Sequence, residues 1–368
     1  MNIGRIDHSI RITDERGCNT SLVFGVEVEV TNVMDSPSRA TLRPTDDAFR
    51  DAGTEPPPRD LLTLPWIDVH NHAHTLSWSD REKYALSGCV GMVMVASGYH
   101  WTPYKPIEPT DIRYLWDDAI NRRAAIEQDH FFEASLGIGL HTGVRIDGVD
   151  ALLDAMDVYC TRDDIVAIGE TGVTPTQHVE SWGIEDQRDL LYQQCTLASS
   201  HDLPLILHLP VDTDGPPRST RVGYGIPGFE KHADLRTPAQ YTAENPAVEA
   251  LTIDIETARE AGIAEKSIVA SHTGPGTLEY LMEHTDCYAS FTLGHQWLLG
   301  VTVDTVAAAI QTYGPERIML DTDCANVLRS DPFAIKRAIF GLYHRGIEPE
   351  TIRTIVYENP RSVFDISA

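Results

Sequence analysis

From Leu61 onward, short apolar runs alternate with amphipathic stretches, and the pattern repeats eight times. Runs that are apolar throughout are typical of parallel strands buried on both faces. The stretches between them have the helical periodicity of segments that cover such a sheet. The predicted strands end near His70, Ser97, Leu140, Gly169, His208, Ser271, Thr292 and Leu320, and the predicted helices span 79–87, 112–127, 148–159, 185–200, 247–261, 277–284, 303–313 and 331–343.

Eight strand–helix units favour an α/β fold, a (β/α)8 TIM barrel over residues 61–368. A doubly wound open sheet is the competing architecture, and it is disfavoured because no glycine-rich phosphate turn follows the first predicted strand. Residues 1–60 differ: Val23–Val30 alternates in part like a strand, and Pro56–Pro58 forms a stiff spacer. This N-terminal extension carries no functional signal and is consistent with a small β appendage, a homo-oligomer contact or a partly disordered segment.

The composition narrows the classes of function. The chain has 55 acidic and 29 basic residues and a formal net charge of -26. Few of the basic residues are lysines, as on surfaces that stay hydrated in high salt, although a GC-rich genome gives the same arginine bias. A broad nucleic-acid surface needs a basic stripe, so nucleic acid is a disfavoured partner. No apolar run reaches the length of a membrane span, and the six cysteines form no C-x-x-C pair. We therefore expect a cytoplasmic protein with reduced thiols.

Side chains that commonly bind metals follow several predicted strands at the point where each ends. His70 and His72 are two residues apart on one strand, so both rings point to the same side and can grip one ion. Glu170 adds a carboxylate able to bridge two cations. Because the C-terminal ends of barrel strands converge on one face, residues far apart in the chain meet there. The candidate metal set is His70, His72, Glu170, His208, His272 and Asp323.

Each member alone is a weak signal. A single histidine at a strand end is more often structural, and Asp321 and Asp323 can simply cap the next helix. Six such residues at successive strand ends are hard to obtain by chance, so the set predicts one or two divalent cations. Zinc is the first choice, with manganese, iron or magnesium as alternatives. We expect Asp323 and Glu170 to be catalytic: Asp323 takes a proton from the attacking water, and Glu170 fixes the cations.

The order of these motifs resembles the TatD-related metal-dependent hydrolases, a branch of the amidohydrolase superfamily. The resemblance covers about residues 61–368. The family's D-x-H-x-H, G-E-x-G, S-H-x-x-G and E-T-D motifs and its closing N-x-x-x-x-F helix are similar to Asp68–His72, Gly169–Gly172, Ser271–Gly274 (with the glycine one position early), Asp321–Asp323 and Asn359–Phe364. The two glutamines of the family's fourth helix are matched to Gln187 and Gln193. The resemblance implies one metal held by His70, His72, Glu170 and Asp323, and another held by Glu170, His208 and His272.

The chain departs from the orthodox nucleases of that family after His208, where a much longer segment precedes His272. The excess, about 210–246, is rich in proline, glycine, arginine and tyrosine, and we interpret it as a lid or specificity loop over the metal face. This makes the chain more similar to the uncharacterised TatD-like proteins than to the nucleases. The basic residues of the segment either hold an anionic group of the substrate or balance an acidic surface; they are Arg218, Arg221, Lys231 and Arg236.

Two more histidines are placed on the same rim. His100 follows the second predicted strand, and His141 follows the third, where the family has a G-x-H-P turn. We expect both to contact the substrate or the leaving group. His74 extends the first motif, and we interpret it as structural or as a support for the ligands.

Metal-activated water is therefore the predicted chemistry, and no G-x-S-x-G turn supports a nucleophilic serine instead. The preferred function is hydrolysis of an ester, lactone, amide or phosphoester bond in a small molecule. One alternative is a metal-dependent 3′–5′ exodeoxyribonuclease, as the family resemblance implies. Another is a non-catalytic barrel that serves as a scaffold, which the complete ligand set argues against.

Overall fold

The structure is a computed structural model that describes residues 11–13, 19–21, 57–97, 108–142, 147–174, 183–210, 246–294, 301–326 and 330–367. The chain divides into two compact units, residues 1–41 and 42–368. In the first unit, β1 (Arg11–Thr13) and β2 (Asn19–Ser21) pair as antiparallel strands. The strand predicted at Val23–Val30 lies outside the described residues. A domain boundary near residue 60 and the role of the extension stay predictions.

The second unit is built on eight parallel strands whose order in the sheet is their order in the chain, β3 to β10. Almost every residue of these strands is buried, which is why they read as mostly apolar runs in the sequence. The bounds are β3 (Trp66–Asn71), β4 (Cys89–Val95), β5 (Glu133–Ile138), β6 (Ile165–Thr171), β7 (Leu205–His208), β8 (Ile268–Ser271), β9 (Tyr288–Thr292) and β10 (Ile318–Asp321). Each ends close to its predicted position.

The first and last strands meet and close the ring. The N–H of Asp323 donates to the carbonyl of His70 at 2.9 Å, and the N–H of His72 donates to the carbonyl of Cys324 at 2.9 Å. Below them, the buried carboxylate of Asp68 accepts hydrogen bonds from the backbone N–H and the hydroxyl of Thr322, at 3.1 and 2.6 Å. The (β/α)8 TIM barrel is therefore confirmed, and the open-sheet alternative is excluded.

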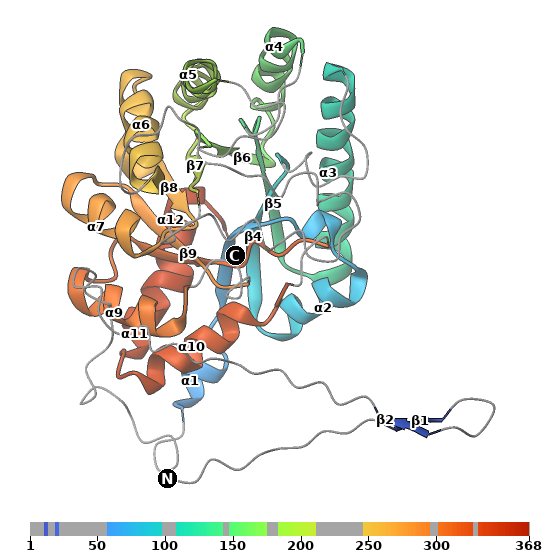
Figure 1. Cartoon of the computed structure of the whole chain (residues 1–368), viewed down its shortest axis with the longest axis vertical. Coiled ribbons are helices and arrows are strands. Elements are labelled where there is room, and N and C mark those ends of the chain that lie inside the picture. Colours follow the sequence, from blue (N-terminus) through green and yellow to red (C-terminus); the bar gives the residue numbers. More distant parts are fainter. Residues whose placement is uncertain are drawn as a thin grey trace. The chain divides into compact units, whose positions relative to one another are not determined.

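Helices lie outside the ring of strands and follow it around the barrel (Figure 1). Their apolar faces pack on the strands in one continuous core. The helices are α1 (Arg59–Leu62), α2 (Trp78–Leu86), α3 (Pro109–His130), α4 (Val149–Tyr159), α5 (Ile184–His201), α6 (Pro246–Glu260), α7 (Pro275–His284), α9 (Val303–Tyr313), α10 (Ala334–His344), α11 (Pro349–Arg353) and α12 (Asn359–Phe364), with short 3-10 turns at Ala73–Thr75 and Glu265–Ser267 and a π turn at Thr354–Glu358.

Within the described parts of the chain, no helix combines the length and apolar character needed to cross a membrane. The cysteines described there, which exclude Cys18, are all free and buried. This agrees with the expectation that the thiols are reduced. The cytoplasmic location stays a prediction.

Candidate metal centre

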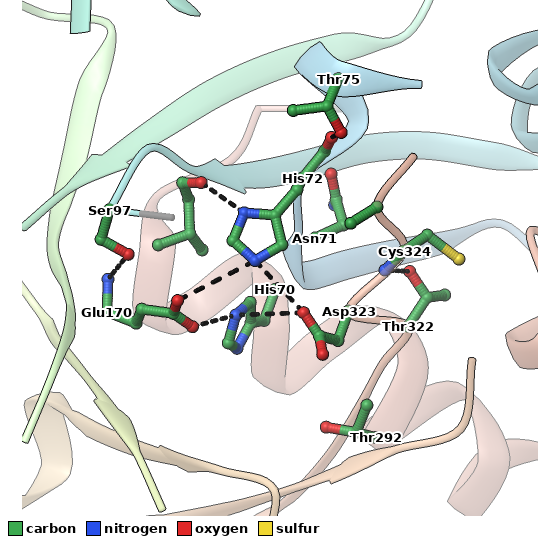
Figure 2. Close-up of polar contacts among 12 residues, drawn as sticks. His70, Asn71, His72, Thr75, Ser97, Glu170, Thr292, Thr322, Asp323 and Cys324 are labelled. Carbon is green, nitrogen blue, oxygen red and sulfur yellow. Dashed lines mark hydrogen bonds and ion pairs between the residues drawn. The ribbon is translucent and has the colours of Figure 1, made fainter. Parts of the chain in front are cut away.

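Side chains from three strand ends converge at the C-terminal face of the barrel. His70 comes from β3 and His72 directly follows it, Glu170 comes from β6, and Asp323 from the turn after β10. The Nε2 of His70 lies 2.8 Å from Oε2 of Glu170 and 3.8 Å from Oδ1 of Asp323. The Nε2 of His72 lies 3.2 Å from the same Asp323 oxygen and 4.0 Å from Oε1 of Glu170. Figure 2 shows the two rings facing both carboxylates.

These separations suit ligands of one divalent cation. Bonds of about 2.0–2.2 Å to nitrogen and oxygen place neighbouring ligand atoms roughly 3–4 Å apart. His72 also has the second hydrogen bond typical of a metal-ligating histidine: its Nδ1 lies 2.8 Å from the carbonyl of Val95, which leaves Nε2 free to face the ion. In the same way, Nδ1 of His272 lies 2.9 Å from the hydroxyl of Thr292. Among the described residues, nothing forms a hydrogen bond to the buried Nε2 of His272. The residues present therefore fit a cation.

The electrostatics of the cluster favour a positive charge at its centre. Burial lowers the pKa of His70, but the neighbouring Glu170 and Asp323 outweigh it and raise that pKa to about 10. Burial raises the pKa of Glu170, whereas His208 and His70 bring it well below its usual value. The negative charge of carboxylates that hold a proton on an imidazole also stabilises a divalent cation at the same place. A histidine that binds the cation gives up this proton.

The backbone is irregular where it delivers these side chains. The pairing of β6 with β7 shifts register between Gly169 and Thr171, so Glu170 stands in a bulge, and the pairing of β3 with β4 shifts between Asp68 and Asn71. Bulges re-aim side chains and are common beside active sites. Among the described non-glycine residues with positive φ, three end helices, and the other two are His272 (φ 64) and Asp323 (φ 48). Such backbone costs about 1–3 kcal/mol per residue and clusters at functional sites.

Two further groups of possible ligands share Glu170. One ligand atom from each of His70, Glu170 and His272 lies within 4.8 Å of the others, and the same holds for His141, Glu170 and His208. The ring of His208 lies 4.5 Å from that of His272 and 4.8 Å from that of His141. All six residues of the predicted metal set thus meet at one face of the barrel.

Comparison with known proteins also indicates a metal-dependent hydrolase. Residues 67–216 match the family profile described as TatD related DNase. An uncharacterised metal-dependent hydrolase of Methanocaldococcus jannaschii is 24% identical over 81% of this chain and 99% of its own length. The chain is similar to the TatD-related metal-dependent hydrolases.

Solved structures share the barrel of this chain. The TatD-like protein of Archaeoglobus fulgidus superposes with a TM-score of 0.56 at 18% identity, over 82% of this chain and 100% of that one. The phosphotriesterase homology protein of Escherichia coli, solved with phosphate in its active site, has a TM-score of 0.54 at 11% identity, over 82% and 99%. These likenesses support the fold.

The structure describes only some of the predicted substrate contacts. His141 is buried and close to the cluster. His100, Arg218 and Arg221 lie outside the described residues, as does almost all of the predicted lid at 210–246. Their contacts with substrate stay predictions, and so do the roles assigned to the individual ligands.

Sequence reasoning overlooked residues whose side chains form hydrogen bonds to the strand ends that carry the cluster. Gln194 on α5 is buried and holds the strand-end residues Leu140 and Thr171, whereas the predicted Gln193 is on the exposed side. A signal was present, because a spacing of seven places Gln194 on the same helix face as Gln187. Ser97 is another such residue: its hydroxyl accepts the N–H of Glu170 at 3.2 Å. No motif marks it.

Proposed function

We propose that this chain hydrolyses an ester, lactone, amide or phosphoester bond of a small molecule with one or two divalent cations, zinc being the first choice. The observation that carries the proposal is the convergence of two imidazoles, His70 and His72, with the carboxylates of Glu170 and Asp323 at 2.8–4.0 Å. A scaffold protein has no need of buried charges collected at one face of a barrel, since burying them is costly.

The exposed fraction of each side chain indicates whether it serves as a metal ligand or also as the base. A bound divalent cation supplies Lewis acidity, which lowers the pKa of a water toward neutrality and polarises the bond under attack. The side chains of His70 and Glu170 are 0% and 2% exposed and serve as ligands. The Asp323 side chain is 16% exposed, so it is the member that also reaches the substrate side. Asp323 therefore accepts the proton from the attacking water and returns it to the leaving group.

Two features of the sequence favour a small molecule over nucleic acid. The net charge of -26 opposes a polyanion that must be held along a broad surface. The long segment about 210–246 suits a lid over a small substrate. We also propose a cytoplasmic location and no membrane partner.

A 3′–5′ exodeoxyribonuclease is the second candidate, because the matching family profile is that of TatD related DNases. It requires a local basic path to the cluster, and it predicts digestion of single-stranded DNA at rates comparable with those for small esters.

The test combines metal content with activity. We expect purified protein to hold at least one equivalent of Zn, Mn, Fe or Mg, and His70→Ala to lose it together with hydrolysis of p-nitrophenyl esters or phosphodiesters. His201→Gln is a matched control, because His201 pairs with Asp157 on the outer surface. A wild-type protein without metal, or unchanged metal in His70→Ala, rejects the proposal. If the protein digests single-stranded DNA at a rate comparable with its hydrolysis of the p-nitrophenyl substrates, the exodeoxyribonuclease replaces the small-molecule hydrolase as the proposed function.

A further inference from the structure

Buried nitrogen atoms without a hydrogen-bond partner gather outside the ring of strands, where the 3-10 turn at Ala73–Thr75, α2 and α3 pack against one another (Figure 1). Among the described residues, nothing forms a hydrogen bond to Nδ1 of His74, Nε of Arg81 or Nε2 of His130. An imidazole nitrogen donates in the appropriate tautomer, and the Nε of arginine is always a donor. Because buried donors in native proteins are almost always paired, three in one region indicate a ligand that supplies the acceptors.

Arg81 is the main charge of this region. Among the residues that the structure describes, none forms an ion pair or hydrogen bond with its side chain, although the chain has 55 acidic residues. Burial lowers the pKa of the Arg81 guanidinium, and repulsion by Arg122 lowers it further, whereas Asp129 acts in the opposite direction. Burial also lowers the pKa of His130, and the charge of Arg81 adds to this effect, against Asp129 and Glu82. The positive charge therefore exceeds what the nearby carboxylates balance.

We propose that Arg81, Arg122 and His130 bind a phosphate group between α2 and α3. The Nη1 of Arg122 donates to the carbonyl of His74 at 3.4 Å, which links the turn to α3, and its Nε pairs with Asp118 in an exposed ion pair. Such a pair is weak in water and leaves the charge of Arg122 available. A phosphate has acceptor oxygens in several directions, which suits donors that come from different elements, and an arginine fork matches its geometry.

The proposed phosphate site lies beside the metal centre but is separate from it. His74 comes two residues after His72, and the two rings are 6.1 Å apart. Neither Arg81 nor His130 belongs to any of the three groups of possible metal ligands. The inference therefore goes beyond the proposed hydrolase and does not depend on it.

One side of the proposed phosphate site is aromatic. The ring of Trp78 lies 5.2 Å from that of His130, which is 5% exposed, whereas Trp78 is 50% exposed. An organic group attached to the phosphate would find this indole face at the surface. The site thus suits either free phosphate or the phosphate of a larger molecule.

Phosphate binding by metal-free protein is the first test, because removal of the metal keeps the anion from binding to the cations. Full-length protein is stripped with a chelator and titrated with inorganic phosphate in a calorimeter. We expect one equivalent in the wild type, and binding weaker by about tenfold or more in Arg81→Gln, since a charge-assisted hydrogen bond is lost. Arg353→Gln is the matched control, because Arg353 is a partly exposed arginine paired with Glu358 on another part of the barrel.

Two further measurements locate the bound phosphate. His70→Ala changes the metal centre, so we expect metal-free His70→Ala to bind phosphate as the wild type does. In protein labelled with ¹⁵N at histidine, phosphate should shift the imidazole signal that is missing from His130→Gln. Melting temperatures show whether each variant is folded.

The source of the phosphate is tested by comparison of inorganic phosphate with phenyl phosphate. Tighter binding of phenyl phosphate that is lost in Trp78→Ala supports the site and identifies a phosphorylated organic molecule as its ligand. Equal affinities also support the site and identify free phosphate.

Three results would overturn the inference. They are a wild type that binds no phosphate at millimolar concentration, a folded Arg81→Gln with unchanged affinity, and a His70→Ala that no longer binds phosphate. None of these results affects the proposed hydrolase, because metal content and hydrolysis are measured separately.

Discussion

Asp323 is the residue on which the proposed chemistry most depends. Its Oδ1 lies 3.2 Å from Nε2 of His72, and its side chain is more exposed than those of His70, His72 and Glu170. Asp323→Asn keeps the shape but cannot accept a proton, so we expect hydrolysis at saturating metal to fall by about 10²–10⁴-fold. Steady-state kinetics with a p-nitrophenyl substrate measures the loss. Asp157→Asn, at an exposed aspartate, is the control. Metal-saturated Asp323→Asn with near-normal turnover would reject Asp323 as the base.

A second residue, Asp254, links stability to pH. It is fully buried on α6, where its Oδ1 accepts the N–H of Val173 at 2.8 Å, and burial raises its pKa well above the usual 3.8. The native state therefore binds more protons than the unfolded chain between those two pKa values. The free energy of unfolding falls as the pH rises through that window, by up to about 1.4 kcal/mol per pH unit.

Asp254→Asn removes this dependence, because the amide oxygen still accepts the N–H of Val173 but carries no titrating proton. Near pH 4 we expect similar stability for the two proteins, and near neutrality a more stable variant. Urea unfolding at several pH values measures the difference, with Glu256→Gln, exposed on the same helix, as the control. An unchanged difference from pH 4 to pH 7 would contradict the raised pKa.

At the scale of residues, the sequence predicts which metal-binding side chain types meet at the barrel face, but not how these side chains group with one another. The order of residue types in the chain places His70, Glu170 and Asp323 at strand ends. Which imidazole shares an ion with which depends on bulges and on positive φ at His272, and these are set by tertiary packing.

At the scale of elements, glycines let β5 and β6 approach closely behind Glu170. A Cβ on Gly139 would lie 2.8 Å from the carbonyl carbon of Gly169 and 2.9 Å from the carbonyl oxygen of Glu170, and backbone atoms cannot turn aside. Gly139→Ala must therefore displace the end of β6. We expect a loss of about 1–3 kcal/mol in stability together with weaker metal binding.

Thermal unfolding with and without added metal checks this prediction. Gly183→Ala is the matched control, since Gly183 has φ -60 and its nearest neighbour is 3.8 Å from the added carbon. If Gly139→Ala bound metal as tightly as the wild type, the close approach of the strands would not be what positions Glu170.

The strands and helices were predictable because both faces of each strand are covered, so apolar runs and helical periodicity survive in the sequence. The closure of the barrel between β3 and β10 could not be read directly from the sequence. It includes two hydrogen bonds that Asp68 accepts from Thr322, a contact between residues at opposite ends of the barrel sequence. The sequence contains both residues, but only the closed ring shows that they meet.

For the whole molecule, the net charge of -26 makes self-repulsion a large term. Salt shortens the screening length from about 10 Å at 0.1 M to about 3 Å at 1 M. It also weakens surface ion pairs such as Arg188–Glu260 and Arg353–Glu358, but exposed pairs contribute only about 0–1 kcal/mol each. The screening of repulsion between acidic residues outweighs the weakening of surface ion pairs, so we expect the melting temperature to rise between 0.1 and about 1 M KCl. A falling melting temperature would favour genomic base composition as the reason for the scarcity of lysine.

Salt also separates the two candidate functions. Binding of a polyanion releases counterions, so a protein with about 6–10 phosphate contacts loses roughly 10³–10⁵ in affinity between about 50 and 200 mM salt. A neutral ester held in a small pocket has no such dependence. We therefore expect kcat/KM for an uncharged p-nitrophenyl ester to change less than about threefold over that range, a limit far below the counterion effect. The same titration with single-stranded DNA is the comparison. Nuclease activity that matched ester hydrolysis at low salt and collapsed with added salt would identify DNA as the substrate, despite the acidic surface.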